Sequence, residues 1–95
     1  MASNKEYLDY VLDLLREVDG ISFKKMMGEY ILYKNNVIIG GIYDNRFLVK
    51  PTKSIKKLGL KEGIPFPGAK PMLLMDIENP GELKEIVEKI YKDLK

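Results

Sequence analysis

Residues 24–50 read KKMMGEYILYKNNVIIGGIYDNRFLVK, and this stretch decides the fold. Ile, Val, Tyr and Phe concentrate in runs that are bounded by short polar breaks, a pattern typical of half-buried strands. The breaks Asn35-Asn36 and Asp44-Asn45 contain residues that tolerate the left-handed conformations of a two-residue hairpin turn. Such short connections join antiparallel strands. The pattern therefore predicts a β-meander with strands at residues 21–27, 29–34, 37–43 and 46–50.

Helical periodicity flanks the meander on its N-terminal side. Ser3 and Glu6 have the spacing of a capping box, in which the Ser3 hydroxyl accepts from the Glu6 amide. Apolar residues then recur at helical spacing up to a stop at Gly20. These are Leu8, Val11, Leu12, Leu15 and Val18. We expect an amphipathic helix of about four turns.

The C-terminal half alternates short elements with a restricted loop. Thr52 or Ser54 caps a predicted short helix that runs from residue 53 to 58 and ends at Gly59. Residues 61–71 contain three prolines and two glycines, which predicts a loop, and residues 72–76 predict a strand. Asn79 and Pro80 open a final helix. Its apolar stripe consists of Leu83, Ile86, Val87, Ile90, Tyr91 and Leu94.

This order of elements predicts one α+β domain over residues 1–95, an antiparallel sheet with helices mainly on one face. The chain contains neither cysteine nor histidine. It therefore lacks thiolate ligands, the commonest general base and the commonest metal ligand, and we expect no catalytic, metal or cofactor site. The N-terminal decapeptide has no apolar run after its first charge, and residues 37–43 are too short to cross a bilayer. We therefore expect a cytoplasmic protein.

Glycine and glutamate interrupt the apolar runs of the meander. Gly40-Gly41 predicts a bulge, or a close approach by another segment. Glu29 fits either an acid or base with a raised pKa, or a structural residue that faces solvent or fixes the Gly28 turn by accepting a hydrogen bond. We favour the structural interpretation, because no second carboxylate or histidine lies nearby in the sequence. We expect the strand methionines Met26, Met27, Met72 and Met75 to fill gaps in the core, with a methionine-rich partner groove as the alternative.

Basic residues concentrate after the meander. Residues 50–71 hold six lysines against the single acidic residue Glu62, whereas the whole chain has a net charge of only +2. Five of these lysines are candidates for contacts with nucleic-acid phosphates, and three of them, at positions 53, 56 and 57, would share a helix face. The five are Lys50, Lys53, Lys56, Lys57 and Lys61. A solubilising surface is the alternative, since Arg16 and Arg46 are the only arginines available for reading bases.

The residues also carry a family resemblance. The step Lys25-Met26-Met27-Gly28-Glu29-Tyr30 and the loop Phe66-Pro67-Gly68-Ala69-Lys70-Pro71 resemble the N-terminal domain of the TfoX/Sxy competence regulators. The likeness continues through Leu32-Tyr33, Ile39 to Ile42 and Asp44 to Lys50. It implies a secretion-chaperone-type α+β fold and a role in transcriptional regulation of bacterial DNA uptake together with a partner transcription factor. It offers no catalytic residues. Longer members of that family carry a second, C-terminal helical domain. The present sequence ends just after its last predicted helix, so we expect a stand-alone version of the N-terminal domain.

We therefore expect a small non-enzymatic regulatory or protein-interaction module with a protein partner, and no cofactor or membrane. The two motifs supply the residues of the predicted interaction surface, which are Met27, Gly28, Glu29, Tyr30, Pro67, Gly68 and Lys70. An exposed edge strand would allow strand addition or a symmetric homodimer. The alternative function is a nucleic-acid-binding accessory factor, with weak binding through the lysines of residues 50–61.

Overall fold

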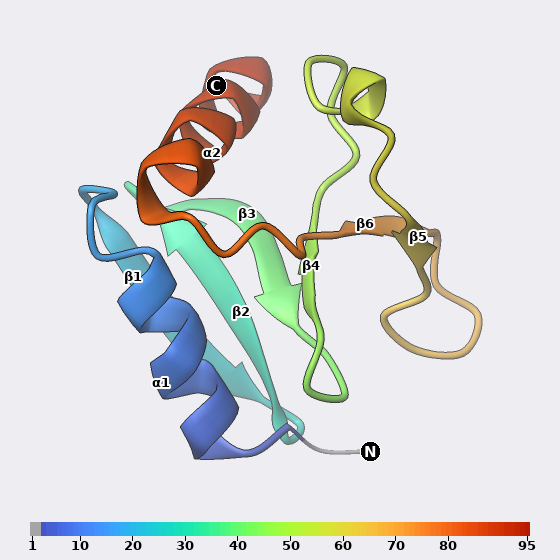
Figure 1. Ribbon diagram of the computed structural model, residues 1–95. Coiled ribbons are helices and arrows are strands. Elements are labelled where there is room, and N and C mark those ends of the chain that lie inside the picture. The colour runs from blue at the N-terminus through green and yellow to red at the C-terminus, as the bar shows by residue number, and fades with distance from the viewer. Residues whose placement is uncertain (1–2) are drawn as a thin grey trace.

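The computed structural model describes residues 3–95 and contains two α-helices and six strands (Figure 1). The elements follow in the order α1 (Lys5–Leu14), β1 (Ile21–Met26), β2 (Glu29–Lys34), β3 (Val37–Ile42), β4 (Phe47–Val49), the 3-10 turn η1 (Lys56–Leu58), β5 (Glu62–Gly63), β6 (Met72–Leu74) and α2 (Pro80–Leu94). This order confirms the predicted α+β class.

All six strands form one antiparallel sheet in the order β1-β2-β3-β4-β6-β5. The first four strands are neighbours in both sequence and space, so the predicted meander is confirmed. The prediction that residues 61–71 form only a loop is wrong at its start, because Glu62 pairs with Leu73 in a two-residue edge strand. The backbone gains ladder hydrogen bonds there although the local sequence, rich in proline and glycine, has little strand propensity.

Three tight turns connect the strands of the meander. Asn35 and Asn36 both have positive φ, as do Asp44 and Asn45, which confirms the two predicted left-handed turns. Met27 and Gly28 form a third turn of this kind, with φ of +52° and +84°. Two consecutive left-handed residues give the type I′ geometry, whose twist matches that of the flanking strands.

Gly40 lies where the meander bends. The register between β2 and β3 shifts at Leu32 and Tyr33, so the predicted bulge is confirmed. A Cβ atom on Gly40 would stand 2.3 Å from the carbonyl oxygen of Leu48 and 2.8 Å from the Cα of Val49. The predicted close approach is therefore also present, and it comes from the backbone of β4.

One hydrophobic core joins both helices to the same face of the sheet (Figure 1). The helices contribute Leu8 and Val11 from α1, and Leu83, Ile86, Val87 and Ile90 from α2. Leu32, Ile42 and Val49 meet them from the strands. Complete burial of such a side chain stabilises the folded state by about 1.5–3 kcal/mol. The placement of helices on one face is thus confirmed.

The first helix differs from its prediction at both ends. The capping box is wrong: Asn4 is the N-cap, and its side chain accepts a hydrogen bond of 2.8 Å from the Tyr7 amide. The Ser3 hydroxyl instead donates a hydrogen bond to the Glu29 carboxylate of β2. The helix ends at Leu14 rather than near Gly20, although Val18 still reaches the core from the turns that follow.

The middle helix is shorter than predicted, while the last one is confirmed. Only Lys56–Leu58 form a 3-10 turn, which Gly59 closes with a φ of +72°. Neither Thr52 nor Ser54 caps it, because its N-cap is Ile55. Asn79 caps α2 by accepting a 3.0 Å hydrogen bond from the Glu82 amide. No helix within residues 3–95 combines the length and the apolar composition needed to cross a membrane.

Candidate functional site

Strand β1 forms one edge of the sheet and is exposed along most of its length. It pairs with β2 on one side only within the described residues, so the other side presents backbone amides and carbonyls that can accept another strand. Phe23 and Met26 are large apolar side chains on this strand that remain exposed to solvent. An edge with free backbone groups and exposed apolar side chains is a surface suited to another polypeptide.

Met27, at the tip of the β1–β2 hairpin, is 96% exposed. The expectation that the methionines fill the core is confirmed for Met75, which is buried, but wrong for Met26 and Met27. The type I′ turn lies at the far end of the hairpin and points the Met27 side chain into solvent. A non-glycine residue with positive φ is strained by about 1 kcal/mol, a condition that occurs often at functional sites. The exposed methionine therefore belongs to the candidate surface.

The Glu29 carboxylate lies directly behind this tip and accepts three hydrogen bonds. Its Oε1 accepts from the Ser3 amide at 2.9 Å and from the Ser3 hydroxyl at 2.5 Å. Its Oε2 accepts from the Asp44 amide at 3.1 Å. These contacts match the structural interpretation of Glu29. They also show that it fixes two distant segments in addition to the hairpin that carries it.

Ser3 extends this network to the turn between β3 and β4. The Ser3 amide also donates to the Gly28 carbonyl at 3.0 Å, and its hydroxyl accepts from the Asn45 amide at 3.0 Å. The Asn45 side chain in turn accepts from the Asn4 amide at 3.0 Å. Hydrogen bonds therefore join the start of α1 and two hairpin turns into one unit. We call this unit, which consists of Ser3, Asn4, Gly28, Glu29, Asp44 and Asn45, the turn network.

Tyr30, the last residue of the predicted step, is only 6% exposed and lies in the core. Its ring meets Phe23 edge-on with centroids 5.9 Å apart. Such aromatic pairs contribute about 0.5–1.5 kcal/mol beyond their buried area. Tyr30 thus supports Phe23 from inside the sheet, and its own side chain does not form part of an accessible surface.

The structure also brings the two family motifs together. A small cavity of about 280 Å³ is lined by Glu29, Asp44, Arg46 and the loop residues 64–67, which include the predicted Pro67. Arg46 holds this loop by donating from its guanidinium to the Ile64 carbonyl at 2.8 Å. Gly68 lies beyond the cavity at the exposed turn of the loop, with a φ of +89°.

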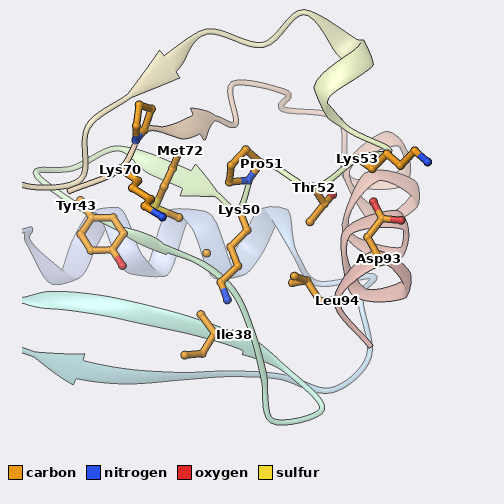
Figure 2. A pocket seen from close by; sticks show the side chains of 12 residues that line it. Ile38, Tyr43, Lys50, Pro51, Thr52, Lys53, Lys70, Met72, Asp93 and Leu94 are labelled. Atoms are coloured by element: carbon orange, nitrogen blue, oxygen red, sulfur yellow. The ribbon is translucent and has the colours of Figure 1, made fainter.

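The predicted lysines do not form one helical face. Lys50 and Lys53 line a larger cavity of about 650 Å³ together with Lys70 of the loop motif (Figure 2). Lys56 and Lys57 lie on the 3-10 turn and do not line this cavity. The expectation that Lys53, Lys56 and Lys57 share a helix face is wrong, because regular helical turns begin only at Lys56. Lys61 is exposed just before β5.

Asp93 of α2 closes one end of the larger cavity and binds the segment after β4. It accepts from the Ser54 amide at 2.8 Å and from the Ser54 hydroxyl at 2.9 Å. These bonds, the amide first, lower the pKa of the Asp93 carboxyl. The Thr52 hydroxyl lies close enough to contribute to this pKa but makes no well-aligned hydrogen bond, and it is buried without a partner.

Residues 3–95 contain no cluster of three or more acidic, histidine or cysteine side chains that could hold a metal ion. The contacts that sequence reasoning missed are all long-range. Ser3 meets Glu29 across 26 positions, and Ser54 meets Asp93 across 39. Neither pair leaves a local signal, because the spacing follows from the fold and not from a motif.

Comparisons with known proteins show a family relationship. No protein-family model matches the chain. The chain is 33% identical over 78 residues to an "Uncharacterized 12.7 kDa protein in trpE 5'region" of Spirochaeta aurantia. The aligned segment covers 80% of this chain and 68% of that relative.

Proposed function

This chain belongs to the same family as the uncharacterized Spirochaeta aurantia protein, and we propose that it is a small non-enzymatic regulatory module that binds a partner protein through β1. The observation that carries the proposal is the exposed edge of the sheet. Strand β1 has an open side, and it ends at the strained, 96% exposed Met27. An extended segment of another protein can add to such an edge as a further strand, with main-chain hydrogen bonds providing affinity.

The charge of β1 favours a segment from a different protein over a second copy of this chain. Lys24 and Lys25 point to opposite faces of the strand, and β1 carries no acidic residue. A symmetric pair of β1 strands would place four ammonium groups on two neighbouring strands, and edge lysines generally prevent such association. The complementary occupant is an extended segment that places acidic side chains beside these lysines and apolar side chains beside Phe23 and Met26.

The turn network supports this role by making the hairpin rigid before binding. Glu29 and Ser3 hold the base of the β1–β2 turn against the start of α1. A surface that is already ordered loses less conformational entropy on association, which raises affinity without new contacts.

The resemblance to the TfoX/Sxy N-terminal domain supports a regulatory purpose for this contact. In that case the partner is a protein that acts in transcription, and the pathway is control of DNA uptake. The alternative function, a nucleic-acid-binding accessory factor, has weaker support. Lys50 is half-buried in a cavity wall and Lys53 lies near the Asp93 carboxylate, so these two lysines are less accessible to the phosphates of a duplex than an exposed cluster would be.

Site-specific photocrosslinking tests the proposal. The photoreactive residue p-benzoyl-phenylalanine replaces Phe23 on β1 or, as a matched control, the exposed Phe66 on the loop. We expect an adduct with another protein from position 23 and not from position 66. The purified partner should then shift the amide NMR signals of β1, and the variant with both Lys24→Glu and Lys25→Glu should bind it at least tenfold more weakly. The pair Lys84→Glu and Lys89→Glu on exposed positions of α2 is the charge-matched control.

Three outcomes would overturn the proposal. The first is equal crosslinking from both positions, and the second is an adduct that contains only two copies of this chain. The third is a partner whose affinity is unchanged by the charge reversal on β1.

A further inference from the structure

The cavity lined by Lys50, Lys53 and Lys70 lies apart from β1 and has no role in the proposed function. It is formed by the start of β3, the segment that follows β4, the residues just before and at the start of β6, and the last turn of α2 (Figure 2). Its volume of about 650 Å³ falls within the roughly 300–1,000 Å³ that is usual for small-molecule sites.

The walls of this cavity are mainly apolar. Ile38, Met72 and Leu94 face it from three different elements, and the Tyr43 ring stands at one end. Gly40 contributes only backbone, because no side chain fits between it and β4. These surfaces suit a ligand with a ring-sized apolar body, which would gain about 25 cal/mol for each Å² of apolar area removed from water.

Positive charge dominates the polar groups of the lining. Three lysines and one carboxylate, Asp93, leave a formal excess of two positive charges. The carboxylate already accepts two hydrogen bonds from Ser54. Figure 2 shows Lys53 extending outward beyond Asp93, whereas Lys70 reaches between Tyr43 and Met72 and Lys50 reaches toward Ile38. Within residues 3–95 the ion pairs are Arg16–Asp13 and Lys34–Glu88, so Lys50 and Lys70 have no anionic partner.

Two neutral donors complete the lining. The Thr52 hydroxyl is buried at 8% exposure without a hydrogen-bond partner. The Thr52 hydroxyl lies near the Asp93 carboxylate but makes no well-aligned hydrogen bond with it, so this buried hydroxyl is available to an acceptor in the cavity. Burial also raises the pKa of the Tyr43 phenol, which keeps its hydroxyl protonated and able to donate at neutral pH.

We infer that this cavity binds a small organic anion, a carboxylate or sulfonate attached to a ring-sized apolar body. The acidic group is held by Lys50 and Lys70 with Thr52 as an additional donor, and the apolar body lies against Ile38, Met72 and Leu94. The site recognises the combination of the two parts. Neither a free inorganic anion nor a neutral apolar molecule uses the whole lining.

A matched pair of fluorescent probes tests this inference. 8-Anilinonaphthalene-1-sulfonate carries the anionic group, and N-phenyl-1-naphthylamine is its neutral analogue. We expect saturable binding of the sulfonate at one site and weaker binding of the amine. The variant with Lys50→Gln and Lys70→Gln should bind the sulfonate about 10- to 100-fold more weakly, the range for losing charge-assisted hydrogen bonds. Its affinity for the amine should change less than about threefold, since that probe has no charge to lose. Circular dichroism establishes that each variant is folded.

Control variants locate the effect. Lys84→Gln with Lys89→Gln removes the same charge from exposed positions of α2 and should leave both affinities unchanged. Thr52→Val removes the unpaired hydroxyl while preserving its shape. It should weaken sulfonate binding severalfold and change the affinity for the neutral amine much less, a difference that a purely structural threonine would not give. Amide NMR shifts on adding the sulfonate should centre on Gly40, Thr52 and Leu94.

Equal losses of sulfonate affinity in the Lys50/Lys70 and the Lys84/Lys89 double variants would overturn the inference, because such losses would reflect net charge alone. Equal affinity for the two probes in the unaltered protein, or amide shifts centred on the β1–β2 hairpin, would overturn it as well.

Discussion

The carboxylate of Glu29 accepts hydrogen bonds from both the amide and the hydroxyl of Ser3, a residue 26 positions earlier in the chain. The same carboxylate accepts a hydrogen bond from the Asp44 amide in the turn between β3 and β4. Glu29, whose place in the sequence also fitted an acid or base, therefore connects three segments: its own hairpin, the start of the chain at Ser3 and the turn at Asp44. These hydrogen bonds give the Gly28-Glu29 step a structural role.

Glu29→Ala should lower the free energy of unfolding by about 1–3 kcal/mol, because the Ser3 hydroxyl and the Asp44 amide lose their acceptor. Urea denaturation followed by far-UV circular dichroism measures this change. Glu85→Ala on the exposed face of α2 is the control and should shift the free energy by less than about 0.5 kcal/mol. Equal effects of the two substitutions would contradict the anchoring role.

Gly40→Ala should be severely destabilising, by more than about 3 kcal/mol, since the new methyl group would collide with backbone atoms of Leu48 and Val49. Gly81→Ala is the matched control. Its methyl group would have ordinary contact with the Asn79 side chain, and alanine in a helix is favoured over glycine by about 0.5–1 kcal/mol. The midpoint of thermal unfolding should therefore fall for Gly40→Ala and rise for Gly81→Ala. A neutral Gly40→Ala would show that β4 can move away from β3.

Met27→Asn should raise the free energy of unfolding by about 0.5–1 kcal/mol, because Asn followed by Gly is the preferred pair for a type I′ turn. The same substitution removes the most exposed apolar side chain of the hairpin. It should therefore weaken partner binding while strengthening the fold, a trade-off expected at functional positions. Urea unfolding and affinity for the crosslinked partner, measured on the same sample, test both halves. A variant that is more stable and binds equally well would exclude Met27 from the partner surface.

Asp93 gives a defined pH dependence. Hydrogen bonds from Ser54 lower its pKa in the folded state, so the fold favours the ionised carboxylate. This stabilisation is present above the unfolded carboxyl pKa of about 3.9 and is lost as the pH falls through the lower folded value. Asp93→Asn should therefore destabilise the protein at neutral pH, and the stability difference from the unaltered protein should shrink in acid. Urea midpoints across this range measure the difference. In a Ser54→Ala background the deficit should be smaller, and a deficit independent of pH would contradict this account.

The nucleic-acid alternative makes a quantitative prediction about salt. Each contacted phosphate contributes about −0.9 to the slope of log affinity against log salt, so five engaged lysines would give about −4.5. We expect a slope no steeper than about −3, since Lys50 is half-buried and Lys53 lies beside Asp93. Fluorescence anisotropy with labelled duplex DNA measures it, and Lys56→Gln with Lys57→Gln should flatten it further. A slope near −4.5 would restore the alternative.

Local patterns in the sequence were sufficient to predict the meander and the presence of the two α-helices, although not the ends of the first one. Strand alternation and the Asn35-Asn36 and Asp44-Asn45 turns depend on neighbouring residues, so the strands from Ile21 to Val49 follow from composition and spacing. Strand β5 could not be predicted in this way, because its two residues are ordered only by pairing with β6.

The site was less predictable than the fold, because its contacts cross the chain. The Ser3-Glu6 capping box failed since the Ser3 hydroxyl forms a stronger, charge-assisted bond with Glu29. The family motifs include Met27 and Glu29, which the structure places at the exposed hairpin tip and in the turn network. They gave no sign that Lys50, Lys70 and Thr52 would line one cavity, which depends on how the segment after β4 passes α2.

The connectivity of the sheet has a consequence for synthesis on the ribosome. All strands of the meander are joined by two-residue turns, whereas Leu48 of β4 must wait for Leu74 of β6, 26 residues later. Short loops close with the least loss of entropy, so the nascent chain can assemble α1 and the first four strands once residue 50 has left the exit tunnel. The face that α2 later covers is then bare until residues 80–94 have also left the tunnel and folded onto it. The growing polypeptide is most vulnerable to aggregation during this interval, and chaperones would act on it there.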